Sequence, residues 1–228
     1  MNLNHYKKTS LYLMFVLTIF VGVIGLFTFQ EWINKTSSAY LDDKLKLIIF
    51  IVSSAIGPSI FYFLFKKIDN DWWQYKWTNF LIQIPNLNGW YFGKVESIVR
   101  SEENKSVIKD CSIEIVQNGS SIKVNMYLFE ENENHFSICE NINAVLVCES
   151  SQTKLYYIYR NEKDQRKVLT GPPSSIGTAE LRVAKEATGE MKLYGSYYNQ
   201  RGNTGIIIAK YIDQTIANEF RKPIQQPN

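Results

Sequence analysis

The stretch Ile84–Ser97, IPNLNGWYFGKVES, separates two parts of the sequence that differ in character. Long apolar runs dominate the residues before it. After it, apolar and polar residues alternate with a period close to two, which is typical of β-strands with one buried face. Proline lacks the N–H that would extend a helix, and Gly89-Trp90 begins the first alternating run. We therefore expect a change from helices to strands here.

Alternating segments continue to about residue 212, and short turns separate most of them. Asn118-Gly119 is a strong hairpin signal, and successive strands joined by short turns usually pair antiparallel. They could form a sandwich or a barrel, and an eight-stranded barrel can hold one small ligand. We predict a small eight-stranded antiparallel up-and-down β-barrel, lipocalin-like, over residues 87–213. The predicted strands are 89–99, 110–117, 121–129, 135–149, 154–160, 176–183, 190–199 and 204–212.

Two further segments in this half of the chain carry no strand pattern. Residues 161–175 form the one long connection, which is charged and contains Gly171-Pro172-Pro173. Connections of this length are often lids or else disordered, and the sequence does not decide between the two. Residues 214–228 are expected to form a flexible tail.

The N-terminal part contains two uncharged apolar runs, 9–30 and 47–65. A helix needs about 20 such residues to cross a hydrocarbon core about 30 Å thick. The first run exceeds the apolar region of a signal peptide, and no small-residue cleavage site follows it. We predict an anchor of two transmembrane helices over residues 1–67. Lysines outside both runs (Lys7, Lys8, Lys66, Lys67) favour a multi-pass protein with both termini cytoplasmic.

Small residues at helical spacing mark the second apolar run. Ser53 and Gly57 are four residues apart, and this spacing lets transmembrane helices approach closely. The face they form could pack against the first helix or associate with another chain. Residues 68–86 are rich in aromatic side chains, which favour the membrane interface. We expect an interfacial linker helix there with Trp73, Trp77, Phe80, Leu81 and Ile84 on one face, although a helix packed on the barrel is an alternative.

Charge, cysteine usage and motifs exclude several function classes. A net charge of +3 does not indicate a broad surface for DNA or RNA. Three cysteines cannot all pair within one chain, in keeping with a reducing compartment. The sequence has no phosphate-binding loop, nucleophile elbow or zinc-protease motif. His135 stands alone, and the cysteines lack zinc-site spacing. We therefore expect a non-enzyme with no catalytic residues, metal or cofactor.

The remaining candidates are aromatic and basic residues on strands. In Leu155–Arg160, LYYIYR, alternation places Tyr157 and Tyr159 on one face, and Tyr197 shares a face with Leu193 in a later strand. They could form a tyrosine-rich core with locally bonded hydroxyls. Alternatively, they line a pocket where rings stack on bases and guanidinium groups bind phosphate. The residues proposed to contact a ligand are Tyr157, Tyr159, Tyr197, Arg201, Thr204 and Trp90, with Arg160 and Arg182 as further cations.

The order of these features resembles one bacterial family. An apolar helical hairpin, an aromatic linker, the motif I-P-x-L-x-G-W-x-x-G and the strand pattern follow one another, as in the SMODS-associating two-transmembrane β-strand-rich effectors of CBASS, the cyclic-oligonucleotide anti-phage signalling systems. The residues that carry the resemblance are Pro85, Leu87, Gly89, Trp90 and Gly93, then Leu155-x-Tyr157-x-Tyr159, then Leu193-x-Gly195-x-Tyr197 with Arg201, Thr204 and Gly205.

The resemblance implies a function that spacing alone does not supply. Such effectors are not enzymes. A partner nucleotidyltransferase (CD-NTase) makes a cyclic dinucleotide or related cyclic oligonucleotide, which the cytoplasmic barrel binds. The chains then oligomerise, and their transmembrane helices disrupt the bacterial inner membrane, so that the cell stops growing or dies. Two alternatives are a membrane-tethered, lipocalin-like barrel that carries a lipid or other apolar ligand, and a scaffold without a ligand. Trp90 could close one end of the barrel.

Overall fold

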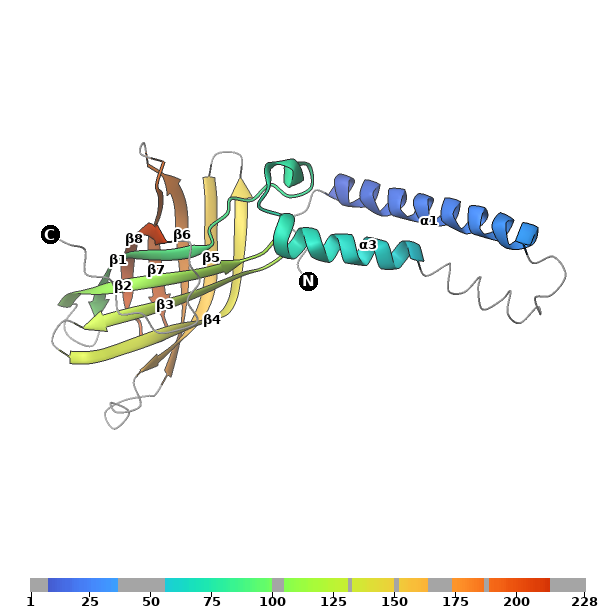
Figure 1. Ribbon diagram of the computed structural model, residues 1–228. Helices are drawn as coiled ribbons and strands as arrows, with labels where there is room; N and C mark the ends of the chain where they lie inside the picture. The colour runs from blue at the N-terminus through green and yellow to red at the C-terminus, as the bar shows by residue number, and fades with distance from the viewer. Residues whose placement is uncertain are drawn as a thin grey trace. The chain divides into compact units, whose positions relative to one another are not determined.

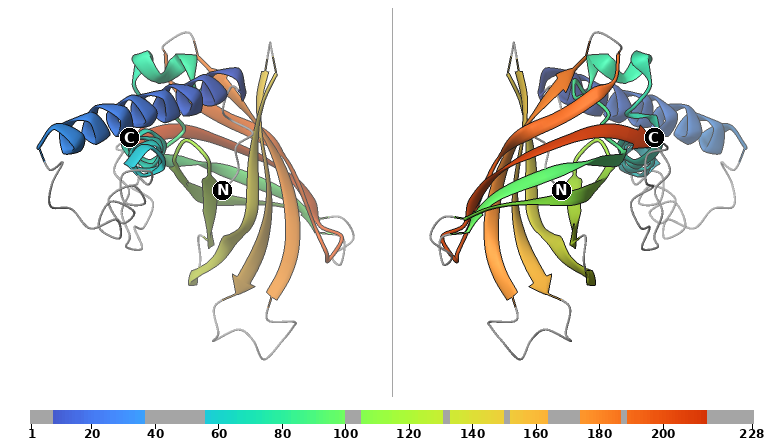
Figure 2. Two further views of the ribbon diagram at one scale, coloured as in Figure 1. Left: turned by 90° about the vertical axis from the view of Figure 1, so that its right-hand side faces the viewer. Right: turned by 90° about the vertical axis from the view of Figure 1, so that its left-hand side faces the viewer.

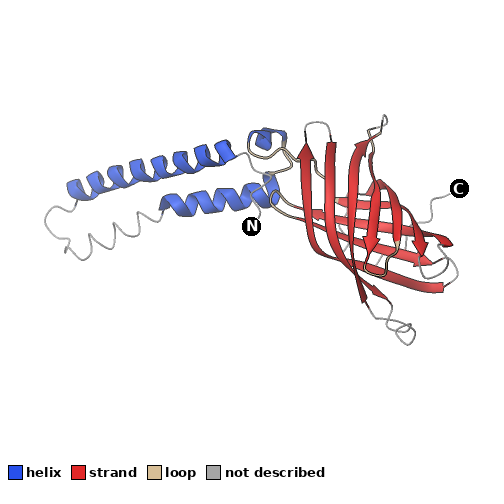
Figure 3. Ribbon diagram, turned by 180° about the vertical axis from the view of Figure 1, so that it is seen from behind, coloured by secondary structure: helices blue, strands red, loops and turns tan. Residues whose placement is uncertain are grey.

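The computed structural model describes residues 8–36, 56–99, 105–130, 133–149, 152–163, 174–186 and 189–213 (Figure 1). The chain forms two compact units. The first comprises Met1–Pro85 together with Asn118–Ser120, and the second comprises Asn86–Gln117 with Ser121–Asn228. Helices lie in the first unit and the strand arrows in the second, as the colours of Figure 3 show.

The second unit is a closed antiparallel barrel in which each strand pairs with the next and β8 pairs with β1 (Figure 2). This confirms the predicted eight-stranded up-and-down barrel and excludes the sandwich. The strands are β1 (Gly89–Val99), β2 (Lys105–Gln117), β3 (Ile122–Glu130), β4 (Glu133–Glu149), β5 (Gln152–Lys163), β6 (Ser174–Lys185), β7 (Met191–Asn199) and β8 (Thr204–Asp213).

Alternation along each strand determines which side chains fill the barrel. In β6, Ser175, Gly177, Ala179 and Leu181 are buried, and the residues between them are more exposed. Directly paired residues on neighbouring strands project from the same side of a sheet. The pairing therefore extends the inward positions from strand to strand around the barrel.

Glycines occupy inward positions where neighbouring backbones leave no room for a side chain. A Cβ added at Gly195 would overlap the carbonyl oxygen of Glu180, and one at Gly93 would overlap that of Ile208. Two tyrosine rings cover other inward glycines: Tyr159 lies over Gly177, and Tyr197 lies over Gly205. Several glycines and tyrosines of the sequence motifs are therefore packing partners.

The start of β1 is tied to the end of β2 by amide hydrogen bonds. The Leu87 N–H donates to Gln117 Oε1 at 2.9 Å, and Asn88 Nδ2 donates to the Gln117 carbonyl at 3.0 Å. The Gln117 N–H donates in return to Asn88 Oδ1. Leu87 is fully buried, and its carbonyl accepts a bond from the hydroxyl of Tyr91. These bonds hold the segment that leads into β1 against the end of β2.

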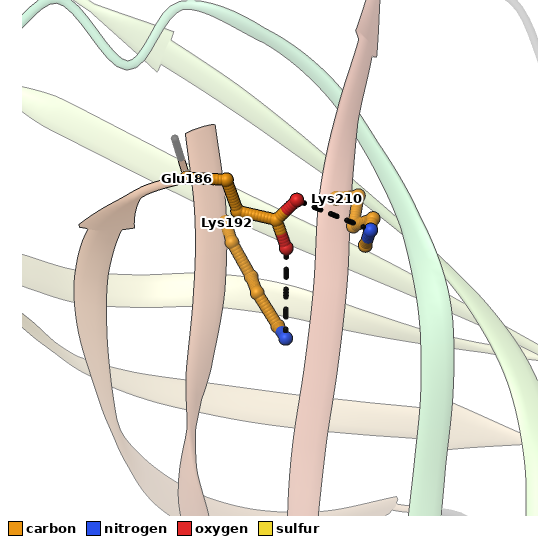
Figure 4. A network of polar contacts seen from close by, with 3 residues as sticks. All are labelled: Glu186, Lys192 and Lys210. Carbon is orange, nitrogen blue, oxygen red and sulfur yellow. Dashed lines mark hydrogen bonds and ion pairs between the residues drawn. The ribbon is translucent and has the colours of Figure 1, made fainter. Parts of the chain in front are cut away.

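One carboxylate bridges two strands at the same end of the barrel (Figure 4). Glu186 follows β6, and its oxygens lie 3.8 Å from Lys192 Nζ on β7 and 3.3 Å from Lys210 Nζ on β8. All three side chains remain accessible to water, and exposed ion pairs contribute about 0–1 kcal/mol. The backbone ladder and the apolar interior, rather than this ion network, therefore stabilise the barrel.

The first unit contains two helices, α1 (Lys8–Thr36) and α3 (Ile56–Lys67). They contact each other through aromatic rings, with Phe61 edge-on to Phe15 at 5.2 Å between ring centroids. Among the described residues, no helix combines the length and apolar character of a membrane span. Ser53 and the part of the second predicted span from 47 to 55 lie outside the described residues, and Gly57 lies in α3.

The predicted linker helix over residues 68–86 is not continuous. A π-helical turn, η1 (Ile68–Trp72), is followed by a 3₁₀ turn, η2 (Lys76–Phe80). The Thr78 hydroxyl approaches the carbonyls of Tyr75 and Trp73 at 2.7 and 3.0 Å. Threonine side chains that bond nearby backbone groups compete with regular helix formation.

The five side chains expected on one face of that helix have different environments. Trp73 and Leu81 are buried in a core with Phe65, Ile68 and Ile82, whereas Trp77 and Phe80 are exposed. The same unit includes the turn between β2 and β3. There the Asp69 carbonyl accepts a bond from the Gly119 N–H, and its carboxylate accepts one from the Ser120 hydroxyl, both at 2.9 Å.

Replacing Gly195 by alanine tests the close approach of β6 and β7. We expect Gly195→Ala to lower the free energy of unfolding by about 1–3 kcal/mol, because the added methyl group meets backbone atoms that cannot move aside. Denaturant unfolding followed by circular dichroism measures the change. Ser196→Ala, at the neighbouring exposed position, is the matched control. Equal stability of the two variants would contradict the packing described.

Candidate ligand-binding site

The interior of the barrel is apolar at one end and polar at the other. Near the start of β1 it is filled with fully buried aliphatic side chains, among them Ile115, Val124, Leu155, Leu181 and Leu193. The other end lies where β5 and β7 finish and β6 and β8 begin. We call it the polar end, and its members at inward positions are Ser97, Asn141, Asn161, Ser175 and Asn199 with Tyr157, Tyr159 and Tyr197.

Strand pairing places these residues in adjacent rows. Asn161 pairs with Cys139 on one side and with Ser175 on the other. In the next row, Asn141 pairs with Tyr159. Side chains that are paired directly across an antiparallel ladder have Cβ atoms about 4.5–5.5 Å apart. The amides and the Ser175 hydroxyl therefore form one compact group.

The three predicted tyrosines come together in this region. Tyr157 and Tyr159 are each 2% exposed, with ring centroids 5.8 Å apart, and Tyr197 pairs with Ala179 beside Tyr157. Burial raises the pKa of all three phenols above the ordinary value, so each stays protonated at neutral pH. Tyr197 shares a hydrogen bond with the Ser97 hydroxyl at 2.5 Å.

Several buried polar atoms of the polar end form no hydrogen bond with the residues that the structure describes. Among the described residues, Asn141 Oδ1, Asn161 Oδ1, Ser175 Oγ and the Tyr157 hydroxyl are buried and form no hydrogen bond there. Leaving such a group unsatisfied costs about 1–3 kcal/mol. Because buried polar groups in native proteins are nearly always bonded, this group is suited to bind a polar ligand.

The structure also reveals a basic residue that sequence reasoning missed. Lys109 occupies an inward, partly buried position on β2, where it pairs with Val95. The predicted strand began only at Asp110, and so Lys109 was assigned to a connection. Asn161 and Ser175 were missed for the same reason, because they were placed in the long connection 161–175. Extending the alternation of β5 and β6 by a few residues would have found both.

The predicted basic residues occupy different positions. Arg201 lies in the turn after β7, partly buried, and its backbone N–H donates to Asn199 Oδ1 at 3.0 Å. It is therefore at the polar end. Arg160 and Arg182 are exposed and alternate with buried residues, so they lie on the outer face. Arg160 and Tyr157 face opposite sides of β5, as alternation along a strand requires.

The other two predicted ligand contacts do not join the tyrosines. Trp90 lies on the outer face, where it pairs with Glu114 and its ring centroid is 5.7 Å from that of Tyr127. Its position does not close an end of the barrel. Thr204 is exposed at the start of β8. Their contact with a ligand remains a prediction.

Metal and thiol chemistry find little support among the described residues. No group of three histidine, cysteine or carboxylate side chains among them could hold a metal ion. Cys111 and Cys139 are buried at inward positions. Burial raises the pKa of the Cys111 thiol to about 12 and also raises that of Cys139. Thiolates are the reactive form, so both cysteines behave as apolar core residues.

A comparison with protein families identifies the domain. The sequence model of the Cap15 cyclic dinucleotide receptor domain matches residues 82–211. The chain belongs to this family. The match begins just before the buried Leu87 and ends within β8, so that the receptor domain coincides with the barrel. This confirms the resemblance to CBASS effectors. A search of curated proteins gives no match.

The candidate ligand-binding residues lie within the receptor domain. The three tyrosines, Asn141, Asn161 and Lys109 are all among the matched residues. Packing accounts for the motif glycines Gly93 and Gly195, whereas the unbonded atoms of the polar end have no structural explanation among the described residues.

The burial of the two core thiols predicts different reactivities for the three cysteines. In the folded chain at pH 8, we expect iodoacetamide to label the exposed Cys148 well before Cys111 or Cys139. Mass spectrometry of timed samples measures the labelling, and unfolding in guanidinium should expose all three. Rapid labelling of Cys111 or Cys139 in the folded chain would contradict their protection.

The same burial has a consequence for alkaline stability. The unfolded chain releases the Cys111 proton near the ordinary value of 9.0, before the folded chain does. The contribution of the protonated Cys111 thiol to the free energy of unfolding is therefore fully present below pH 9. It is lost as the pH rises towards about 12, the pKa of this thiol in the folded chain.

Proposed function

We propose that this protein is a CBASS effector whose barrel binds a cyclic dinucleotide or a related cyclic oligonucleotide at the polar end. The carrying observation is the group of buried, unbonded polar atoms inside a domain of the cyclic dinucleotide receptor family. A partner nucleotidyltransferase supplies the ligand. The protein acts as a receptor and catalyses no reaction itself.

The charges and rings of the polar end suit such a ligand. A cyclic dinucleotide carries two phosphodiester groups and two bases. Lys109 offers a cation at an inward position, and Arg201 offers another at the adjoining turn. Positively charged side chains form the stronger, charge-assisted hydrogen bonds with phosphate oxygens. Tyr159 and Tyr197 supply rings of the kind on which bases stack, and Tyr197, 9% exposed against 2% for Tyr159, is the more accessible of the two.

A lipid carrier is the less favourable alternative. An apolar ligand would require an interior that is apolar along its whole length. The end near Leu155 and Leu181 meets this requirement, but it is already filled by packed side chains. The polar end does not meet it, because an alkyl chain would leave the amides of Asn141 and Asn161 without partners.

The response to the ligand is a further part of the proposal. Ligand binding promotes oligomerisation of the chains, and the N-terminal helices then disrupt the inner membrane and stop growth. Apolar side chains exposed on α1 support contact with lipid, since such patches mark membrane or protein interaction sites. They include Tyr12, Leu13, Phe20, Val21 and Phe27, which are 58–71% exposed. In this proposal the N-terminal part crosses the membrane twice, and both termini of the chain are cytoplasmic.

Titration with cyclic dinucleotides tests the receptor function. We expect the full chain in detergent to bind at least one cyclic dinucleotide, and Lys109→Gln to weaken binding about tenfold or more, because a charged hydrogen bond contributes about 1.5–3 kcal/mol. Isothermal titration calorimetry measures the dissociation constant. Lys94→Gln removes an exposed lysine of neighbouring β1 and serves as the matched control.

Two results would count against this proposal. Binding of lipid with no binding across a panel of cyclic di- and trinucleotides would favour the carrier. Equal affinities of the Lys109→Gln and Lys94→Gln variants would remove Lys109 from the site.

A second variant tests the proposed role of the small-residue face in the helices. We expect Gly57→Leu to leave nucleotide binding unchanged and to reduce ligand-triggered leakage, because a large side chain keeps helices from approaching closely. Dye release from vesicles that contain the full chain measures leakage. Ile60→Leu, an apolar exchange of equal size in α3, is the control. Undiminished leakage with Gly57→Leu would exclude this face from the mechanism.

A further inference from the structure

We infer that Asn141, Asn161 and Ser175 form the base-reading part of the polar end and determine which cyclic dinucleotide is recognised. We call these three residues the reading group. This inference rests on the proposed receptor function, and it assigns specificity to side chains distinct from the basic ones. Contacts to phosphate position a nucleotide, whereas contacts to base edges carry its sequence information.

The reading group lies on adjacent rows of three neighbouring strands. Asn161 on β5 pairs directly with Ser175 on β6. Asn141 on β4 pairs with Tyr159, two residues from Asn161 along β5. Positions two apart on a strand are separated by about 6.6 Å. The Asn161 amide and the Ser175 hydroxyl, which are on directly opposite residues with Cβ atoms about 4.5–5.5 Å apart, can reach one base edge, and Asn141 lies one row away beside the ring of Tyr159.

The chemistry of the reading group matches bases better than phosphates. Each amide carries both a donor and an acceptor, and a serine hydroxyl can act as either. Base edges present donors and acceptors in patterns that such neutral side chains recognise. A phosphate group has only acceptor oxygens, so it could bond the N–H and O–H donors of this group but would leave Asn141 Oδ1 and Asn161 Oδ1 without a donor. Lys109, in contrast, supplies a positive charge but no combination of donors and acceptors that could distinguish one base from another.

Buried polar atoms without a bond also occur on the outer face, at Trp90 Nε1 and Ser112 Oγ, but other amides of the barrel do have partners. Asn88 and Gln117, at the apolar end, use their side chains to bond the backbone of β1 and β2. Asn199 Oδ1 accepts bonds from the N–H groups of Arg201 and Asn203. These amides have structural partners. Asn141 Oδ1 and Asn161 Oδ1 have none among the described residues, which identifies them as groups kept for a ligand.

The bulge in β4 supports the same assignment. Asn141 pairs with Tyr159 and Asn143 pairs with Ile158, so that Ile142 is an extra residue in the ladder. Bulges redirect side chains and are frequent near functional sites. Here the strand changes register directly after Asn141, at the boundary between the reading group and the row of Tyr157.

The experiment measures how the affinity for a cyclic dinucleotide depends on its bases. The full chain in detergent is titrated with cyclic dinucleotides that share one linkage and differ in their bases. We expect Asn161→Leu and Ser175→Ala to reduce the ratio of dissociation constants between the worst and best ligands at least tenfold. We expect Lys109→Gln to weaken all ligands by a common factor and to leave this ratio unchanged.

Stability of the ligand-free chain gives a second readout that a structural role would not produce. Because Asn161 Oδ1 is buried without a partner, Asn161→Leu should raise the Tm even as it removes selectivity. Asn143→Leu on β4 and Thr178→Ala on β6 change exposed residues of the same strands and are the matched controls. Asn161→Ser provides a smaller replacement should the leucine variant fail to fold.

The outcomes separate the inference from the function on which it rests. No binding of any cyclic dinucleotide by the unmodified chain would overturn the receptor function and the inference together. Binding with equal affinity for all bases, or an unchanged ratio in the Asn161 and Ser175 variants, would overturn the inference and leave the receptor function intact.

Discussion

The pairing of β1 with β8 is the constraint on which the other features of the barrel depend. It removes both sheet edges and fixes a single register around the ring of strands. Because side chains alternate with a period of two, a shift by one residue would exchange the interior and exterior of a strand. Close backbone contacts at Gly93 and Gly195 help to exclude such a shift, since a side chain moved into either position would meet a carbonyl.

Closure with this register places apolar and polar side chains at opposite ends of one interior. At the apolar end, buried leucines and the bonds of Asn88 and Gln117 satisfy the packing and polar requirements of the fold. At the polar end, tyrosine rings cover glycines, while Asn141 Oδ1 and Asn161 Oδ1 form no hydrogen bond within the described part of the chain. Each such buried atom lowers the stability of the fold. A ligand bound there, as proposed, would recover part of that free energy.

The outcome for individual residues depended on how far the strand pattern was followed. The boundaries of β1 and the existence of every strand were predictable, because alternation between hydrophobic and polar residues is strong in the middle of each strand. The extensions of β2, β5 and β6 were missed because Lys109, Asn161 and Ser175 are polar residues at inward positions. A polar residue at an inward position interrupts the alternation of hydrophobic and polar residues. Strand ends that carry such residues are therefore hard to recognise from the sequence, and these are the positions where a polar ligand would bind.

Local periodicity was enough to predict the change from helices to strands near Pro85, the strand count and the shared face of Tyr157 and Tyr159. The closure of the sheet, the outer position of Trp90 and the inner position of Lys109 depend on which strands become neighbours, and they were established by the three-dimensional structure. The aromatic linker likewise forms two short turns in place of the expected helix, and the Thr78 hydroxyl bonds nearby carbonyls there. The bare amides became visible only in three dimensions, because hydrogen-bond satisfaction depends on which strands become neighbours.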